Sequence, residues 1–362
     1  MTRRSGGAPS LRVAFVPVKD DWNAASARLR VFLPIEHLRA AGVDASRCEP
    51  SAVAAGDLVV FSKCYGPEQQ SLAREFRRRG ARPLLDLCDN HFWVPDDAPH
   101  LQELADELRR MLELVDGVSV ASEALRDVVA RERPELPLAV VEDAFDPMET
   151  PLLERLRRWL HKRDRRSLRL HGRGLRLCWF GHHGDVAPPF GLIDLERLLP
   201  TLAEVHAQAP LQLTVITGSK ARFDERIAAH ARVPVRFRQW RRDTFRQLLA
   251  QHDACVLPIG DNPFTRCKSA NRPLLALHAG VPVVADPLPS YQPLAAWVRF
   301  GTFGAALREL ATEPLAWRAA TRAGQQHVRA EWTPVRVVRQ WTEWLSRFVP
   351  VAACAPEHAA DA

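Results

Sequence analysis

Residues 257–286 read LPIGDNPFTRCKSANRPLLALHAGVPVVAD. The stretch begins as a short apolar strand, passes through a polar loop and continues as a helix. After Gly280 and Pro282 it enters a second apolar strand. Strand, helix and strand in this order are typical of the βαβ unit of a parallel sheet. Because ligands of such sheets bind beyond the carboxyl ends of the strands, the polar loop lies where a binding site is expected.

The same alternation of short apolar runs and longer helical patterns covers both halves of the chain, which predicts two open α/β sheets. In the first half we expect strands at 11–18, 57–62, 82–87, 117–121 and 136–141, and helices at 25–41, 68–79, 101–115 and 123–131. In the second half we expect strands at 175–180, 211–217, 233–237, 254–258 and 281–285, and helices at 192–208, 223–231, 244–251, 269–278, 303–311, 314–329 and 335–348. The predicted division is a Rossmann-like domain over 1–150, a basic linker over 151–174 and a second Rossmann-like domain over 175–334.

The composition is that of a soluble globular chain, with 46% hydrophobic and 26% charged residues among 362. No run approaches the ~20 apolar residues of a membrane span, and the first ten residues lack the apolar core of a secretory signal. The seven cysteines are scattered without a CxxC pair, which argues against a disulfide framework and against a zinc site. We therefore expect a cytoplasmic protein.

The formal net charge of +7 and the pI of about 9.3 would suit nucleic acid, an anionic membrane or a phosphate-rich substrate. No nucleic-acid-binding module is recognisable and the arginines are dispersed, so no specific nucleic-acid partner is expected. Within 152–173, leucines and a tryptophan recur at helical spacing among arginines, as in a basic helix that lies on an anionic membrane. Packing of this apolar stripe on the protein's own domain is the commoner arrangement and stays open.

The opening stretch also contains a candidate anion site. We expect a helix to begin near Ser269, with this serine as the N-cap. The free N–H groups and the dipole at the start of a helix favour an anion. Lys268 and Arg272 add positive charge and a bidentate fork for phosphate oxygens. An ordinary surface helix that begins with basic residues is the alternative. The other polar candidates of this region are Asn271, Asp261 and Asn262.

Polar residues follow two further strands. Beyond the strand at 175–180, Gly181 leaves room for close approach of a phosphate, and His182 and His183 can donate to it. No further ligand at a recognisable spacing supports a metal site there. Beyond the strand at 82–87, a carboxylate such as Asp89 can orient or deprotonate a hydroxyl group, with His91 close by. The alternative is that Asp86 is a buried hydrogen-bonding residue and that its neighbours cap the next loop.

Lysine is rare among the 50 basic residues, so its positions are informative. All the lysines except Lys162 fall just past predicted strands, at the rim where these folds bind ligands. They are Lys19, Lys63, Lys220 and Lys268.

These motifs together resemble those of GT-B glycosyltransferases, and among them glycosyltransferase family 4. The segment Ala279-Gly280-Val281-Pro282-Val283-Val284 matches the Gly-x-Pro motif of that family and is its most specific counterpart here. Looser matches cover nearly the whole chain: Ala27-Arg28-Leu29-Arg30 with the helix to Gly42, Val115 to Leu125, Glu142 to Asp146, Trp179-Phe180-Gly181 and Val235 to Pro258.

The resemblance implies two Rossmann-like domains that face a central cleft, with the helix at 335–348 crossing back to the first domain. It implies transfer of a sugar from a nucleotide-sugar donor to a saccharide or lipid-linked acceptor, with retained configuration and no metal or other cofactor. Lys268 and Arg272 would stabilise the departing diphosphate, and Asp89 and His91 would lie near the reacting sugar. The implied donor contacts are Gly181, His182, His183, Lys220, Trp240, Asp261, Asn262, Ser269 and Asn271, with Trp240 beside the base.

One departure from the family pattern bears on activity. The family carries two glutamates in an E-x7-E arrangement, and these positions fall on Cys267 and Leu275 here. The Lys-Ser-x-Asn-Arg cluster would then have to replace the missing donor contact. The alternative is a catalytically inactive protein that keeps the fold as a binding partner. A dinucleotide-dependent oxidoreductase is disfavoured, because neither half shows G-x-G-x-x-G after its first strand.

Overall fold

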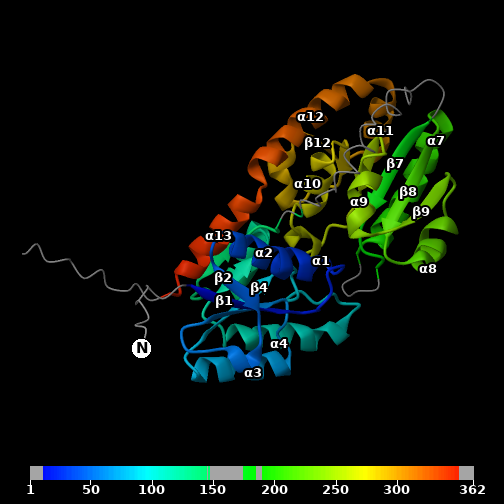
Figure 1. The fold of residues 1–362 in the computed structure, drawn as a ribbon. Coiled ribbons are helices and arrows are strands. Elements are labelled where there is room, and N and C mark those ends of the chain that lie inside the picture. Colours follow the sequence, from blue (N-terminus) through cyan, green and yellow to red (C-terminus); the bar gives the residue numbers. More distant parts are fainter. Residues whose placement is uncertain (1–10, 145, 147–173, 185–189, 350–362) are drawn as a thin grey trace, which may run out of the picture.

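The computed structural model describes residues 11–144, 146, 174–184 and 190–349. Within this part the chain forms two six-stranded sheets, in the orders β2-β1-β3-β4-β5-β6 and β12-β11-β10-β7-β8-β9, with every strand pair parallel. The predicted pair of α/β sheets is therefore confirmed, and each forms the centre of one lobe of the molecule (Figure 1). The proposed linker at 151–174, apart from Gly174, lies outside the described residues.

The N-terminal lobe begins at β1. Its strands are β1 (Arg12–Pro17), β2 (Asp44–Arg47), β3 (Leu58–Ser62), β4 (Arg82–Leu87), β5 (Val118–Val120) and β6 (Leu138–Val140). Its helices are α1 (Ala25–Ala27), a π-helical turn (Arg28–Phe32), α2 (Leu33–Ala40), α3 (Pro67–Arg78), α4 (Gln102–Leu112) and α5 (Glu123–Glu132), with short 3₁₀ turns at Pro50–Ala52 and Pro99–Leu101. The helix expected at 25–41 is thus interrupted by one wide turn.

The C-terminal lobe repeats the pattern. Its strands are β7 (Leu175–Phe180), β8 (Leu211–Thr217), β9 (Val235–Gln239), β10 (Ala254–Leu257), β11 (Val283–Ala285) and β12 (Val298–Phe300). Its helices are α7 (Leu192–Gln208), α8 (Lys220–Phe223), a π-helical turn (Asp224–Ala228), α9 (Arg242–Leu249), α10 (Asn271–His278), α11 (Phe303–Thr312), α12 (Pro314–Glu331) and α13 (Pro334–Ser346), with 3₁₀ turns at Thr265–Cys267 and Pro289–Leu294.

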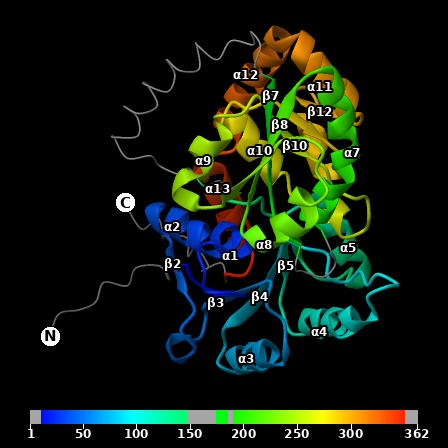
Figure 2. The ribbon, with the colours of Figure 1, turned by 90° about the vertical axis from the view of Figure 1, so that its right-hand side faces the viewer.

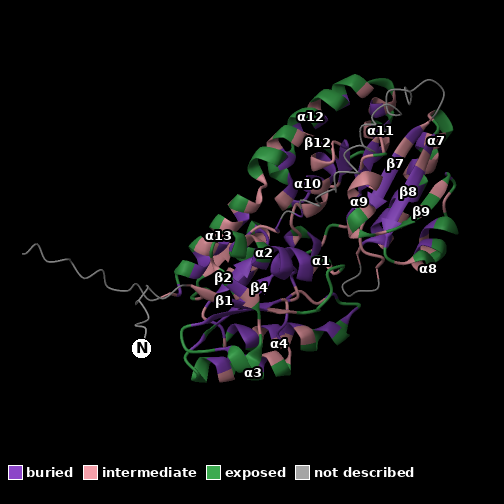
Figure 3. Cartoon of the chain, in the orientation of Figure 1, coloured by how far each residue is buried: buried purple, intermediate pink, exposed green. Residues whose placement is uncertain are grey.

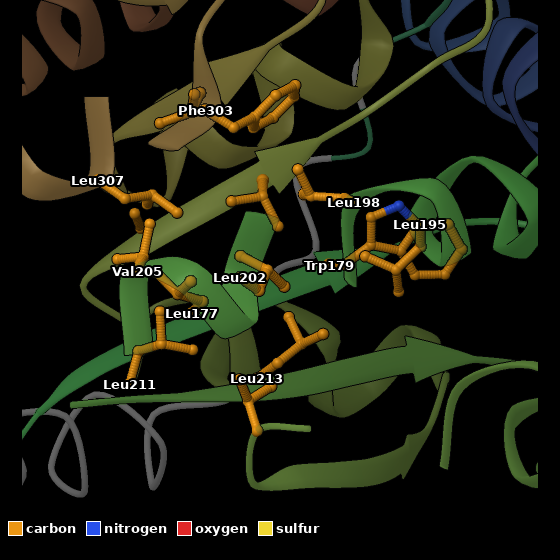
Figure 4. Close-up of a cluster of buried hydrophobic side chains, with 14 of the residues drawn as sticks. Leu177, Trp179, Leu195, Leu198, Leu202, Val205, Leu211, Leu213, Phe303 and Leu307 are labelled. Carbon is orange, nitrogen blue, oxygen red and sulfur yellow. The ribbon is translucent and has the colours of Figure 1, made fainter. Parts of the chain in front are cut away.

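The core of each lobe lies where helices cover a sheet. In the C-terminal lobe, leucines of α7 pack with side chains of β7, β8 and α11 in a cluster that includes the fully buried Trp179 (Figure 4). Burial follows the elements as expected of such sheets: the strands are largely buried and the helices expose their outer faces (Figure 3). Burying a side chain of Leu or Phe size contributes roughly 1.5–3 kcal/mol, so these clusters supply the main stabilisation of each lobe.

The last helix joins the two lobes. α12 runs along the C-terminal lobe, and α13 continues from it onto the N-terminal lobe (Figures 1 and 2). The Trp341 ring of α13 packs edge-on against Phe15 of β1, with ring centroids 5.3 Å apart, and Trp344 is buried in the same cluster. None of the helices in the described residues is both long and apolar enough to cross a membrane.

Candidate active site

The carboxyl ends of strands from both sheets meet between the lobes. Hydrogen bonds cross from one lobe to the other: Asn90 Nδ2 donates to the Pro263 carbonyl at 3.0 Å, and Ser122 Oγ donates to the Cys267 carbonyl at 2.7 Å. The loop after β10 is therefore held against the loops that follow β4 and β5. Parallel strands place their carboxyl ends at one edge of a sheet, which explains why these loops converge.

Asp89 lies at the centre of this meeting point. The residue is 7% exposed, and its carboxylate forms ion pairs with Lys63, directly after β3, and with Lys268 of the opposite lobe. Burial alone would raise the pKa of Asp89, but the ammonium groups of Lys268 and Lys63 hold it well below its ordinary value. Lys63 has a left-handed backbone with φ 54°, which is uncommon outside glycine and which turns the chain sharply after the strand. A pair of cations thus encloses one carboxylate.

His91 lies beside this cluster and is contacted from both lobes. The Tyr65 hydroxyl bonds to His91 Nδ1, and the Phe264 ring of the opposite lobe stacks on the imidazole at a centroid distance of 5.8 Å and an interplanar angle of 12°. Burial, together with the positive charge of Lys63, lowers the pKa of His91 to about 4. The imidazole is therefore neutral near pH 7.

Asp86, the last residue but one of β4, has a structural role. Its buried carboxylate accepts from Arg30 and from the hydroxyl groups of Ser62 and Ser119. This confirms the reading of Asp86 as a buried hydrogen-bonding residue. The same Arg30 lies 3.4 Å from Asp143, which extends the network to the face between the lobes.

Ser269 does not cap α10, contrary to the sequence prediction. The N-cap is Ala270, without a side-chain hydrogen bond, and Ser269 Oγ instead donates to Asp143 Oδ2 at 2.5 Å. Lys268 is extended and Ala270 adopts a turn conformation, so the helix begins two residues later than predicted and the serine points at the N-terminal lobe. A hydrogen bond from a hydroxyl group to a carboxylate is stronger than one between neutral groups, which favours this contact.

The two basic residues of the predicted anion site differ in their surroundings. Lys268 Nζ lies 4.0 and 4.1 Å from the ring centroids of Phe190 and Phe264, in addition to its pair with Asp89. Arg272, in the first turn of α10, has its guanidinium carbon 5.6 Å from the Trp179 ring. Its Nε and Nη2 atoms are buried and have no hydrogen-bond partner within the described parts of the chain. Buried guanidinium N–H groups without acceptors are costly, and they are able to donate to an anion.

The glycine turn after β7 lies over the same end of the sheet. A Cβ at Gly181 would come within 2.8 Å of the Trp179 ring, so no larger residue fits there without a shift. The His182 and His183 rings stack at 4.3 Å, and His182 Nδ1 accepts from the Gly184 amide at 3.0 Å. Asp185, the next residue along the chain, lies outside the described residues.

The remaining predicted donor residues have structural partners. Lys220 pairs with Asp224 at 2.5 Å on an exposed turn, and Asp261 forms a bidentate pair with Arg266. Asn262 Oδ1 accepts from the amides of Phe264 and Thr265. The guanidinium carbon of Arg28 lies 4.8 Å from the centroid of the Trp240 ring. Asn271 is the first residue of α10. Contact of these residues with a donor stays a prediction.

Comparison with solved structures identifies the fold. The pneumococcal O-GlcNAc transferase GtfA, solved with UDP and GlcNAc, superposes with a TM-score of 0.57 and 13% identity over 82% of this chain and 58% of that one. A glycosyltransferase from Rickettsia africae ESF-5 gives a TM-score of 0.65 and 10% identity over 95% of this chain and 100% of that one. The UDP-forming alpha,alpha-trehalose-phosphate synthase from Burkholderia vietnamiensis gives a TM-score of 0.58 and 12% identity over 89% of this chain and 75% of that one.

The chain has the GT-B fold. At these identities the likeness concerns the fold alone, and the chain spans 58% of the length of the pneumococcal structure. No protein-family model matches the sequence, and no curated protein matches it significantly. In the GT-B arrangement the Asp89 cluster lies between the lobes, and Arg272 lies in the first turn of α10 on the side of the C-terminal lobe.

Four residues of the candidate site between the lobes were not predicted from the sequence. Tyr65 and Asp143 contribute from the N-terminal lobe, and Phe190 and Phe264 from the other. The weak signal for Tyr65 was its place two residues after Lys63, beyond the carboxyl end of a strand. Within the described ranges there is no group of three or more His, Cys, Asp or Glu side chains arranged to hold a metal ion.

Proposed function

We propose that this chain is a glycosyltransferase that moves a sugar from a nucleotide-sugar donor to a saccharide or lipid-linked acceptor. The observation that carries the proposal is Arg272, whose buried Nε and Nη2 lack partners among the residues described. An unpaired fork at the start of a helix fits the oxygens of a diphosphate. The GT-B fold, shared with transferases solved with UDP, supports a nucleoside diphosphate as that anion.

Two cations would act on the leaving group. Arg272 would hold the diphosphate from the start of α10, and Lys268 would add a point charge from the adjacent loop. Positive charge fixed where a departing diphosphate develops negative charge stabilises the transition state. Cationic side chains can supply this without a metal, so we propose metal-independent transfer with no other cofactor.

The acceptor side would be formed by the N-terminal lobe. Asp89 and His91 lie on the face of this lobe that meets the donor lobe. Asp89 pairs there with Lys268, and His91 stacks on Phe264. The low pKa of His91 makes it a hydrogen-bond donor to a sugar oxygen and a poor base at neutral pH. Partly buried Leu275 stands where the second glutamate of the related motif would contact the donor ribose, so the ribose would have to find another partner. Retention of configuration rests on the family resemblance.

We propose a cytoplasmic site of action, with synthesis of a surface polysaccharide or glycoconjugate as the process. The anionic membrane contact through 152–173 is part of the same proposal and concerns residues beyond the described ones. It rests on the basic amphipathic pattern of that segment.

A thermal-shift screen with UDP, GDP, CDP, ADP and dTDP in the presence of EDTA tests the proposal. A nucleotide at about 100 times its Kd stabilises the folded chain by roughly 2.7 kcal/mol, a readable shift. We expect one nucleotide to stabilise the wild type and to have little effect on Lys268→Ala and Arg272→Lys, because the second change keeps the charge and removes the fork. Arg318→Ala, which removes an exposed charge on α12, is the matched control.

The nucleotide that binds then selects the donors for an activity assay. Release of that nucleoside diphosphate from its sugar conjugates, with and without simple saccharide acceptors, would establish transfer. Binding without any release or transfer would favour the inactive binding partner. No stabilisation by any nucleotide would contradict the proposed donor class.

A further inference from the structure

The imidazole of His91 is fixed by two different contacts. Tyr65, in the loop between β3 and α3, bonds to Nδ1 through its hydroxyl group and meets the imidazole edge-on, with ring centroids 6.1 Å apart at 65°. Phe264 covers one face of the ring from the opposite lobe. Tyr65 is itself held firmly: it is 4% exposed, and Gln70 Nε2 donates to its carbonyl at 2.9 Å.

The protonation of both rings decides the direction of the hydrogen bond. Burial raises the pKa of Tyr65, so its hydroxyl keeps its proton. The charged groups that face His91 are Lys63, Asp89 and Lys268, and with burial they leave the imidazole neutral. A neutral imidazole has one N–H and one acceptor nitrogen. Within the described chain the Tyr65 hydroxyl has His91 Nδ1 as its sole hydrogen-bond partner, so a phenol that did not donate to Nδ1 would bury its proton unpaired.

We propose that Tyr65 is a positioning residue that donates to His91 Nδ1 and so fixes His91 as the tautomer with its proton on Nε2. The Nε2–H then faces away from the phenol and is available to donate to a substrate oxygen in the site between the lobes. Donation to a substrate rests on the proposed glycosyltransferase function, whereas the tautomer itself does not. The partner of a hydrogen-bonded imidazole nitrogen sets which nitrogen carries the proton.

The tautomer can be measured by long-range ¹H–¹⁵N NMR on full-length protein labelled with ¹⁵N-histidine, with His91→Gln to assign the His91 signals. In the wild type we expect the Nε2–H tautomer throughout pH 5 to 8. In Tyr65→Phe we expect a mixture of tautomers and a higher pKa for His91, because a hydrogen bond to the neutral form has been removed. Phe264→Leu, which removes the stacked ring and leaves the phenol, should keep the Nε2–H tautomer.

Two results would overturn the proposal. One is an Nδ1–H tautomer in the wild type, since the phenol would then be the acceptor. The other is an unchanged Nε2–H tautomer in Tyr65→Phe, provided that far-UV circular dichroism shows the variant to be folded. If Tyr65→Phe unfolds, Tyr65→Met offers a second folded variant that lacks the hydroxyl group, with the same expectation.

A kinetic readout separates this proposal from the proposed function. We expect Tyr65→Phe to lower kcat roughly 10-fold by loosening His91, and to leave the Kd of the nucleoside diphosphate unchanged, because that ligand is bound by the other lobe. A tautomer change without any detectable sugar transfer in the wild type would uphold the positioning role and contradict the proposed function. A fall in nucleotide affinity equal to the fall in kcat would contradict the positioning role.

Discussion

At the scale of single residues, the neutral state of His91 has a consequence for stability. Its pKa is about 4 in the folded chain, against an ordinary value of 6.5. As the pH falls below 6.5, the unfolded chain takes up a proton on this residue that the folded chain does not. The free energy of unfolding therefore decreases as the pH falls from 6.5 toward 4. Near pH 7 the titration of His91 has little effect on it.

We predict that the wild type loses about 2 kcal/mol more unfolding free energy between pH 7 and pH 5 than His91→Gln does, since glutamine takes up no proton in either state. Urea unfolding followed by circular dichroism at several pH values measures the difference. His100→Gln removes an exposed imidazole and should keep the pH dependence of the wild type. Parallel curves for the wild type and His91→Gln would mean that His91 titrates normally in the folded protein.

The polar residues of the site were partly predictable because they follow strands. Asp89 and His91 stand just past an apolar run, and Lys268 lies in the loop that follows another; parallel strands bring such positions to one edge. The pairing of Lys63 and Lys268 on one carboxylate was not predictable, because it depends on how two sheets face each other. The aromatic contacts of Phe190 and Phe264 likewise follow no periodicity in the sequence.

At the scale of elements, the strongly patterned segments were predicted to the residue. The bounds of β4, β7, β8 and α7 match those expected, since each is a long apolar or amphipathic run between clear breaks. β2 was missed because Asp44–Arg47 is a short polar strand at the edge of its sheet, and β12 because Val298–Phe300 is only three residues long. Edge strands are buried on fewer sides, so their sequences carry less of the apolar signal.

The contact of α13 with the N-terminal lobe depends on a small residue before β5. A Cβ on Gly117 would come within 2.6 Å of the Phe348 ring and 2.7 Å of the Trp344 ring. Gly117 has no positive φ, so the close approach, and not the backbone conformation, requires glycine there.

We predict that Gly117→Ala destabilises the chain by about 1–3 kcal/mol through overpacking. A double-mutant cycle with Trp344→Leu checks the cause, because the smaller side chain makes room for the added methyl group. In that background Gly117→Ala should cost clearly less. Equal costs in both backgrounds would show that the tryptophan is not what limits the size of residue 117.

At the scale of the whole molecule, polar contacts bridge the two lobes close to the candidate site. They include Asp89 with Lys268, Asp143 with Ser269, Asn90 with the Pro263 carbonyl, and Asp146 with Arg242. The first of these engages a lysine that the proposed function assigns to the donor diphosphate. The carboxylate of one lobe and the ligand of the other then compete for the same ammonium group, which would couple donor binding to the contact between the lobes.

Asp89→Asn tests this competition. With the carboxylate removed, Lys268 is free for the diphosphate, and we predict a gain of about 1 kcal/mol, roughly fivefold in affinity, for the nucleotide selected by the thermal-shift screen, measured by calorimetry at low salt. The gain should vanish in the double variant Asp89→Asn with Lys268→Ala. Asp116→Asn changes the net charge equally at an exposed pair with Arg77 and should bind as the wild type does. Weaker binding by Asp89→Asn would contradict this competition. It would mean that Asp89 holds Lys268 in the position in which it binds the diphosphate.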